Sequence, residues 1–243
     1  MELIPTPYHQ TGATDDFTAA ASEMALVHNC IIRALNSIYM QAPHVPAAEH
    51  TNFVKYCMAT YQGLTSHHHG EEEHFFPEIE RLTGDKGLME ANVEQHKVFE
   101  TSFVAWGDWL QLVDSHKTDF RPDMCLSLMD DFIPSLSTHL SDEIATLTSL
   151  SRYSGTLDLR ALMKAEAEKT MGGMSKTGVL PVFFLNHDCN FEGGWHNFPE
   201  MPAAVRWVLR SLCGRWHGEW WKFSTVTFDG RPRALMFTGE ERL

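Results

Sequence analysis

The sequence lacks a long hydrophobic run, an excess of basic residues and any closely spaced pair of cysteines. Its longest apolar run covers residues 179–185, which is far too short to span a bilayer, so we expect no membrane insertion. With 19 Lys and Arg against 32 Asp and Glu, the formal net charge is −13. This acidic balance argues against a general affinity for nucleic acid or for anionic membranes.

The five cysteines are odd in number and widely spaced, and no C-x-x-C motif occurs. This pattern predicts reduced, buried thiols in a cytoplasmic protein rather than a disulfide framework. The first residues include no basic segment followed by a long apolar core, so we expect no signal peptide. With 243 residues, 43% of them hydrophobic, the chain is long enough for a large domain or for a domain with an extension.

Four consecutive segments have the apolar periodicity of amphipathic helices. The first begins at a capped, acidic start at residues 14–16 and ends before Pro43, and the fourth begins near Pro122. The lead-in before the first segment is expected to be irregular, and the second is expected to end at Phe76-Pro77. The four predicted helices cover residues 14–42, 47–76, 88–116 and 122–150.

Histidine and glutamate are concentrated in the second segment, where residues 67–74 contain four histidines and three glutamates. In a helix, His67 and Glu71 lie one turn apart, and so do His68 and Glu72. Leu64, on the apolar stripe, precedes His67 by three residues and His68 by four, so periodicity alone does not choose between the two pairs. A solvated, charge-rich surface is the ordinary explanation of such a run.

The other three helices favour a metal centre over a charged surface. Each places one histidine on its apolar face, and the fourth adds a glutamate one turn later: His28, His96, and His139 with Glu143. Carboxylates on a core-facing stripe are costly unless they are paired or bind a metal. Imidazole and carboxylate ligands converging in a four-helix bundle are a recurrent way to build a dinuclear iron site. Zinc or manganese stays open as an alternative.

With these residues the chain resembles the hemerythrin-like (HHE cation-binding) family over about residues 15–150. In that family a histidine and a glutamate precede a Phe-Pro pair, and counting back from Pro77 gives His67 and Glu71, with His68 and Glu72 as alternates. The resemblance implies an all-α, up-down four-helix bundle that holds two non-haem irons. The metal ligands it implies are His28, His67, Glu71, His96, His139 and Glu143.

One feature departs from the oxygen-carrying members of the family, which supply two histidines one turn apart on the third helix. Here Asn92 and Glu100 flank His96 at those positions. A site with more carboxylate and less imidazole favours oxygen activation over reversible oxygen carriage. We therefore expect a di-iron oxygenase or oxidase that uses dioxygen to oxidise a small organic molecule.

Two other functions remain open at this stage: a non-catalytic protein that binds or senses iron, oxygen or nitric oxide, and a structural bundle with adventitious metal. An organic-sized cavity beside the metal centre would favour the enzyme. The predicted bundle domain spans residues 14–152.

The remaining chain, residues 153–243, is expected to form an extension that packs on the bundle. It includes a predicted helix at residues 156–171, a second at 202–213 and a small hairpin around Asp229-Gly230. Five tryptophans lie in it: Trp195, Trp207, Trp216, Trp220 and Trp221. The extension is similar to that of fungal hemerythrin-like proteins. His187-Asp188 and His217-x-Glu219 are weaker candidates for a second metal site, because capping and turn roles are commoner.

Overall fold

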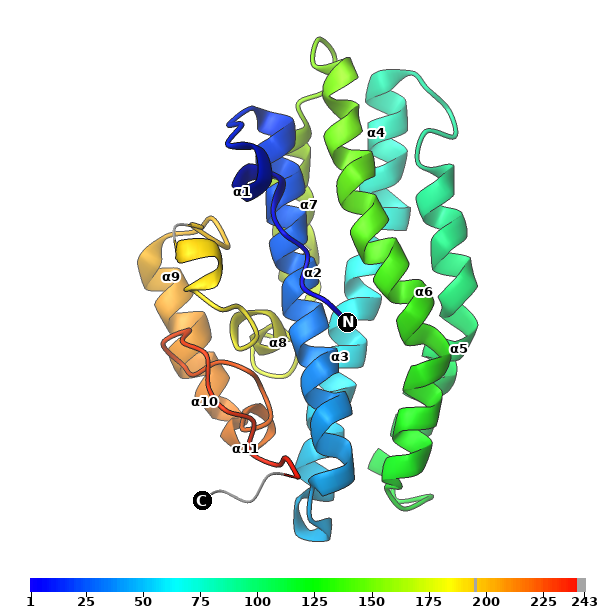
Figure 1. Cartoon of the computed structure of the whole chain (residues 1–243), viewed down its shortest axis with the longest axis vertical. Helices are drawn as coiled ribbons and strands as arrows, with labels where there is room; N and C mark the ends of the chain where they lie inside the picture. Colours follow the sequence, from blue (N-terminus) through cyan, green and yellow to red (C-terminus); the bar gives the residue numbers. More distant parts are fainter. Residues whose placement is uncertain (195, 240–243) are drawn as a thin grey trace.

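A computed structural model describes residues 1–194 and 196–239, and within these ranges the chain forms helices and no strand. The predicted all-α fold is confirmed. Four long antiparallel helices form an up-down bundle, and shorter helices cover one side of it (Figure 1). The bundle consists of α2 (Asp16–Gln41), α3 (His50–Gly70) continued by the π-helical η3 (Glu71–Phe75) and α4 (Phe76–Thr83), α5 (Glu90–Asp114) and α6 (Pro122–Ser149).

Local sequence explains where these helices begin and end. The Asp15 side chain accepts hydrogen bonds from the Phe17 and Thr18 amides and so caps α2. Pro122 occupies the first turn of α6, where its missing N–H costs nothing. Gly84 ends α4 in the left-handed conformation at φ 73°.

Two expectations about helix boundaries were wrong. The lead-in contains a short helix, α1 (Pro7–Thr11), because the Thr6 side chain caps it and Gly12 closes it at φ 70°. The second helix does not stop at Pro77 but continues to Thr83. The π-helical turn η3 immediately precedes Pro77, and its longer hydrogen-bond register removes the clash that proline causes inside a regular α-helix.

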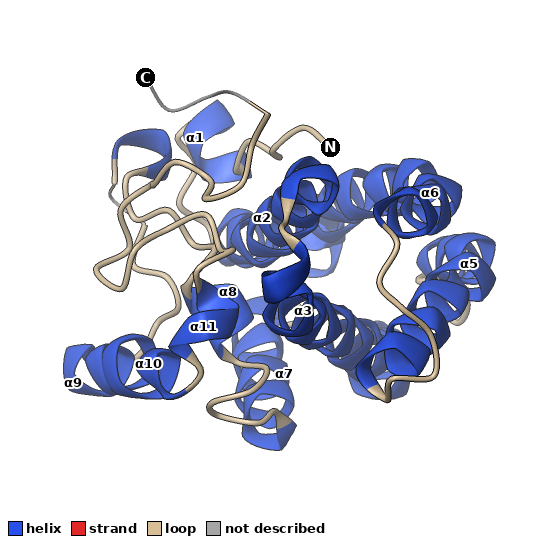
Figure 2. Cartoon of the chain, turned by 90° about the horizontal axis from the view of Figure 1, so that it is seen from below, coloured by secondary structure: helices blue, strands red, loops and turns tan. Residues whose placement is uncertain are grey.

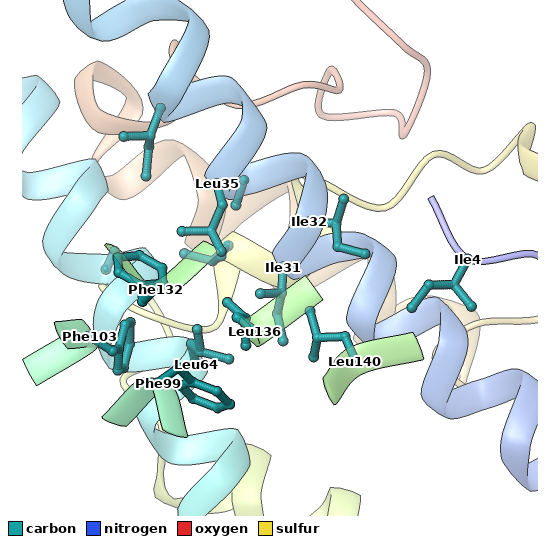
Figure 3. Close-up of a cluster of buried hydrophobic side chains, with 14 of the residues drawn as sticks. Ile4, Ile31, Ile32, Leu35, Leu64, Phe99, Phe103, Phe132, Leu136 and Leu140 are labelled. Carbon is teal, nitrogen blue, oxygen red and sulfur yellow. The ribbon is translucent and has the colours of Figure 1, made fainter. Parts of the chain in front are cut away.

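The hydrophobic core lies between the four long helices on either side of the metal-site candidates. Figure 3 shows Leu64 of α3 between aromatic and aliphatic side chains of α5 and α6. These core side chains are less than one-tenth exposed, so the bundle interior is closely packed and excludes water. No helix within the described ranges is both long and apolar enough to cross a membrane.

The chain after the bundle packs against α2 and α3, on the side away from α5 and α6 (Figure 2). Gln41 of α2 donates a hydrogen bond to the Phe223 carbonyl over 2.9 Å, and Trp221 and Phe223 are fully buried. The extension comprises α7 (Leu159–Gly173), α8 (Pro181–Phe184), α9 (Ala203–Trp207), the π-helical η6 (Val208–Cys213), α10 (Gly214–Trp216) and α11 (Gly218–Trp221). Short 3-10 turns are η1 (Ala42–His44), η2 (Ala47–Glu49), η4 (Leu150–Tyr153) and η5 (Phe191–Gly193).

The expected hairpin is reduced to a tight turn. A single antiparallel bridge joins Val226 to Pro232, and Gly230 closes the turn between them at φ 82°. The Thr227 amide donates to the Arg231 carbonyl and the Arg233 amide donates to the Thr225 carbonyl on either side of this bridge. Trp195, one of the five tryptophans counted in the extension, lies outside the described residues.

Candidate metal centre

The four bundle helices bring every predicted ligand to one buried region at mid-height. The contributing side chains are His28 from α2, His67 and His68 from α3, Glu71 from η3, His96 from α5, and His139 and Glu143 from α6. Within the described residues, two sets of potential ligand atoms converge, each with all its atoms within 4.8 Å of one another. One set is His28, His67 and Glu71, and the other is His68, Glu71, His96 and His139.

Carboxylates connect the two sets. Glu71 belongs to both: its Oε1 lies 3.1 Å from His67 Nε2, and its Oε2 lies 3.6 Å from His96 Nε2. Glu143 stands between the sets as well, with Oε2 at 3.3 Å from His28 Nε2 and 3.8 Å from His139 Nε2. Carboxylates thus lie between both sets of potential metal ligands.

The outer nitrogens of three histidines fix their tautomers. His28 Nδ1 lies 2.8 Å from the Leu140 carbonyl, which only accepts, so this nitrogen carries the proton. His96 Nδ1 likewise lies 2.6 Å from Glu72 Oε1, and His139 Nδ1 lies 3.3 Å from Gln95 Oε1. With these protons on the outer nitrogens, each of the three rings presents Nε2 to the cluster.

Inside the cluster, lone pairs face lone pairs. The Nε2 atoms of His96 and His139 are 3.0 Å apart, and with the proton of each ring on Nδ1 the two nitrogens face each other as acceptors. His28 Nε2 faces a Glu143 oxygen at 3.3 Å, and this contact lacks hydrogen-bond geometry. Such mutual repulsion is relieved when a cation lies between the donors.

Several buried polar atoms of the cluster have no hydrogen-bond partner among the described residues. They are the Nε2 atoms of His28, His67 and His68 and both carboxylate oxygens of Glu71 and Glu143. Buried polar groups are normally satisfied, so seven orphaned atoms at one place need an explanation. Metal coordination is the ordinary use of buried imidazole and carboxylate atoms without hydrogen-bond partners, so the residues present fit a metal centre.

Electrostatics supports the same conclusion. Burial and neighbouring histidines hold the pKa values of His67, His68 and His139 well below the usual range, so these rings stay neutral ligands near pH 7. Burial, followed by the nearby carboxylates of Glu143, Glu166 and Glu72, raises the pKa of Glu71. Ionised Glu71 thus needs a compensating positive charge, and a bound cation supplies it.

The structure shows how the two histidine–glutamate pairs that sequence periodicity left undecided are placed. His67 and His68 both direct Nε2 into the cluster, so the two do not exclude each other. Glu72 stays outside: its side chain is 44% exposed and orients His96. The widened turn η3 follows these histidines directly and places Glu71 inward. The sequence offered no signal for the orienting roles of Gln95 and the Leu140 carbonyl, because both depend on contacts between helices.

The weaker candidates for a second metal site, in the extension, do not come together in the described part of the chain. Over the residues that the structure describes, neither His187 nor His217 belongs to a group of three or more potential metal ligands. His217 instead stacks on Trp220 with ring centroids 3.8 Å apart, and buried His187 packs against Phe198.

An apolar cavity of about 100 Å³ reaches the metal-site candidates from the side of the extension, touching His67 and Glu71. Its walls come from α2, η3, α7, α8 and the loop at residues 198–199. Four phenylalanines and four methionines dominate the lining: Phe75, Phe183, Phe184, Phe198, Met24, Met163, Met171 and Met174. Glu23, Glu166 and Thr170 are the other polar residues in it. The volume is on the scale that holds a single aromatic ring.

A four-helix bundle with a buried histidine–glutamate cluster defines a class of helical metal-binding proteins. The family model described as "Hemerythrin HHE cation binding domain" matches residues 19–150. The chain belongs to this family of cation-binding domains, which confirms the resemblance seen in the sequence.

The chain is also 31% identical over 222 residues to "Dimeric xanthone biosynthesis cluster protein R11" of Cryptosporiopsis sp. (strain 8999). The match covers 91% of this chain and 84% of that protein, so it includes the extension as well as the bundle. No solved structure matches the chain.

Proposed function

We propose that this protein is a non-haem di-iron oxygenase or oxidase that activates dioxygen to oxidise a small, largely apolar molecule. The observation that carries the proposal is the apolar cavity that opens onto Glu71 and His67. A protein that only stores or senses a small ligand needs a metal site but no cavity of this kind beside it. The name of the relative, which refers to a xanthone biosynthesis cluster, supports a role in making an organic compound.

The ligand set supports iron. His28, His67, His68, His96 and His139 would hold the two ions together with Glu71 and Glu143, with Glu71 shared between them. Imidazole and carboxylate suit iron, whereas structural zinc sites are usually rich in thiolate. Among the described residues, no cysteine belongs to either set of potential ligands.

Iron, when bound, supplies the redox chemistry with dioxygen, and the side chains of this chain control where that chemistry acts. The hydrogen bonds from His28, His96 and His139 to their outer partners keep the Nε2 lone pairs directed at the metal positions. The phenylalanine and methionine walls exclude water and bind the apolar body of a substrate. Glu166, which accepts a hydrogen bond from Thr170 over 2.6 Å, is placed to accept another from a substrate hydroxyl.

Metal content and optical spectra test the proposal. We expect about two irons per chain, and a transient absorption band when oxygen is admitted to an anaerobic ferrous sample. A stable and reversible band would instead indicate a carrier. One zinc ion, or no metal with no optical change, would contradict the oxygen chemistry.

Filling the cavity should separate substrate access from metal binding. Ala167 lines the cavity on α7, so Ala167→Phe places a ring where the substrate would lie. We expect about two irons to be retained and oxygen-dependent oxidation of bound apolar substrates to fall at least about tenfold, equivalent to ~1.4 kcal/mol. Single-turnover assays with a panel of small aromatic compounds measure this.

The matched control is Ala165→Phe, on the same helix at an exposed position that lines a separate, shallower hollow and not the apolar cavity. It should behave like the parent protein. Equal turnover in both variants would show that substrates do not enter through this cavity.

A further inference from the structure

A second hollow, which we call the arginine pocket, lies on the extension and shares no lining residue with the apolar cavity. It has a volume of about 670 Å³ and lies between the α9–η6–α10 segment and the turn at residues 227–229. Its lining is Ala203, Arg206, Trp207, Arg210, Ser211, Arg215, Thr227, Phe228 and Asp229. Three arginines from one helical stretch therefore meet in one pocket, in a chain whose net charge is −13.

Arg210 is the centre of the pocket and is only 8% exposed. Its Nη1 contacts the Cys189 sulfur at 3.3 Å, while Nε and Nη2 are buried without a hydrogen-bond partner among the described residues. The guanidinium packs so closely on Gly230 that a Cβ there would lie 2.5 Å from Nη1. A buried cation with two unused donor groups is costly, and a bound anion would offset that cost.

Arg206 and Arg215 flank Arg210 at spacings of four and five residues. The π-helical turn η6 accommodates the longer spacing, so all three side chains line the same pocket. Arg206 donates to Asn197 Oδ1 over 2.7 Å, yet its Nε is also buried with no partner in the part of the chain that the structure describes. Arg215 lies over the Phe228 ring, 4.8 Å from its centroid.

One carboxylate is too little negative charge to neutralise these three arginines. Asp229 is the one carboxylate among the described lining residues, and it pairs with Arg231 over 3.3 Å. Behind the pocket, burial and the charges of Arg210 and Arg33 lower the pKa of His187 to about 3, so that ring is neutral. The pocket therefore has a surplus of positive charge and unused N–H donors.

We propose that the arginine pocket binds the phosphate group of a small organic ligand. Three guanidinium groups offer more N–H donors than the two oxygens of a carboxylate can accept from. A phosphate group has more oxygens and more negative charge, so it matches this set of donors better. The Ser211 and Thr227 side chains add hydroxyls to the lining, and Trp207 supplies an exposed ring for the organic part of the ligand.

Calorimetric titration of the full-length, metal-loaded protein with phenyl phosphate tests this proposal. Arg206→Gln and Arg215→Gln each remove one charge from the pocket, and we expect each to raise Kd about tenfold or more. Arg121→Gln is the matched control, since Arg121 is an exposed arginine of the bundle that pairs with Asp123. It should leave Kd unchanged. Quenching of Trp207 fluorescence, lost in Trp207→Phe, locates the binding event in the pocket.

Because Arg210 is buried, Arg210→Gln risks preventing folding, so a thermal-shift measurement on the other variants provides the second test. Phenyl phosphate should raise the Tm of the parent protein and should raise it less in the Arg206 and Arg215 variants. Sedimentation with phosphatidylcholine vesicles, with and without phosphatidic acid, distinguishes a free ligand from a lipid headgroup as the source of the phosphate. Absence of saturable binding to either probe, or binding that the Arg206 and Arg215 variants retain in full, would overturn the proposal.

Discussion

Glu71→Ala should empty both metal positions, because Glu71 is the one side chain that belongs to both sets of ligand atoms. We expect the affinity for ferrous iron to fall by more than about 100-fold, beyond the effect of losing a residue that only orients a ligand. The purified variant should contain little iron, and the optical response to oxygen should disappear. Iron analysis after equilibrium dialysis against a ferrous buffer gives the affinity directly.

Two neighbouring glutamates provide graded controls for this experiment. Glu72→Ala removes the acceptor that holds His96 Nδ1 at 2.6 Å, so iron affinity should fall by about 10- to 100-fold. Glu73→Ala should have no effect, because Glu73 is half-exposed and pairs with exposed His69 at the surface. If the three variants bind iron equally well, Glu71 is not a shared ligand and the proposed site is wrong.

Removing the metal should strongly destabilise the fold, because the empty site leaves lone pairs and carboxylates facing each other in the core. A metal present at a thousandfold excess over its Kd contributes about 4 kcal/mol of stability. For a chain of this size each 1 kcal/mol changes Tm by roughly 2–4 °C, so chelation should lower Tm by about 8–16 °C. Calorimetric scans with and without chelator, followed by ferrous iron, measure the loss and its recovery.

Glu143→Gln tests that interpretation most directly, because its effect on Tm should have opposite signs in the metal-free and the metal-loaded protein. In the metal-free protein the new amide can donate to the His28 Nε2 lone pair, now 3.3 Å from a Glu143 oxygen, so Tm should rise. In the metal-loaded protein the loss of a charged ligand should lower Tm. A metal-free parent as stable as the loaded one would mean that the cluster does not depend on a cation.

Much of the site could be predicted because its ligands lie on long helices with clear periodicity. His28, His96 and His139 each fall on an apolar stripe, and an amphipathic helix turns such a stripe towards the bundle core. The same periodicity could not decide between His67 and His68, since adjacent residues differ by only about 100° around a helix. Both contribute Nε2 atoms to the cluster, next to the π-helical turn η3 that sequence periodicity does not reveal.

The sequence suggested a cavity beside the metal centre, but neither its lining nor the arginine pocket could be predicted, because each is formed by segments that are distant in the sequence. Glu71 and Ala167 line one cavity only after α7 has packed along the bundle, and Arg210 meets Gly230 only after the final turn has closed over η6.

The sequence by itself determined the helices, the inward histidines and glutamates, and the cation-binding family, since these depend on local periodicity and short-range spacing. Only the tertiary structure decided which lone pairs face each other, which carboxylate is shared and where ligands can enter, because these depend on distances between atoms that the chain brings together from far apart.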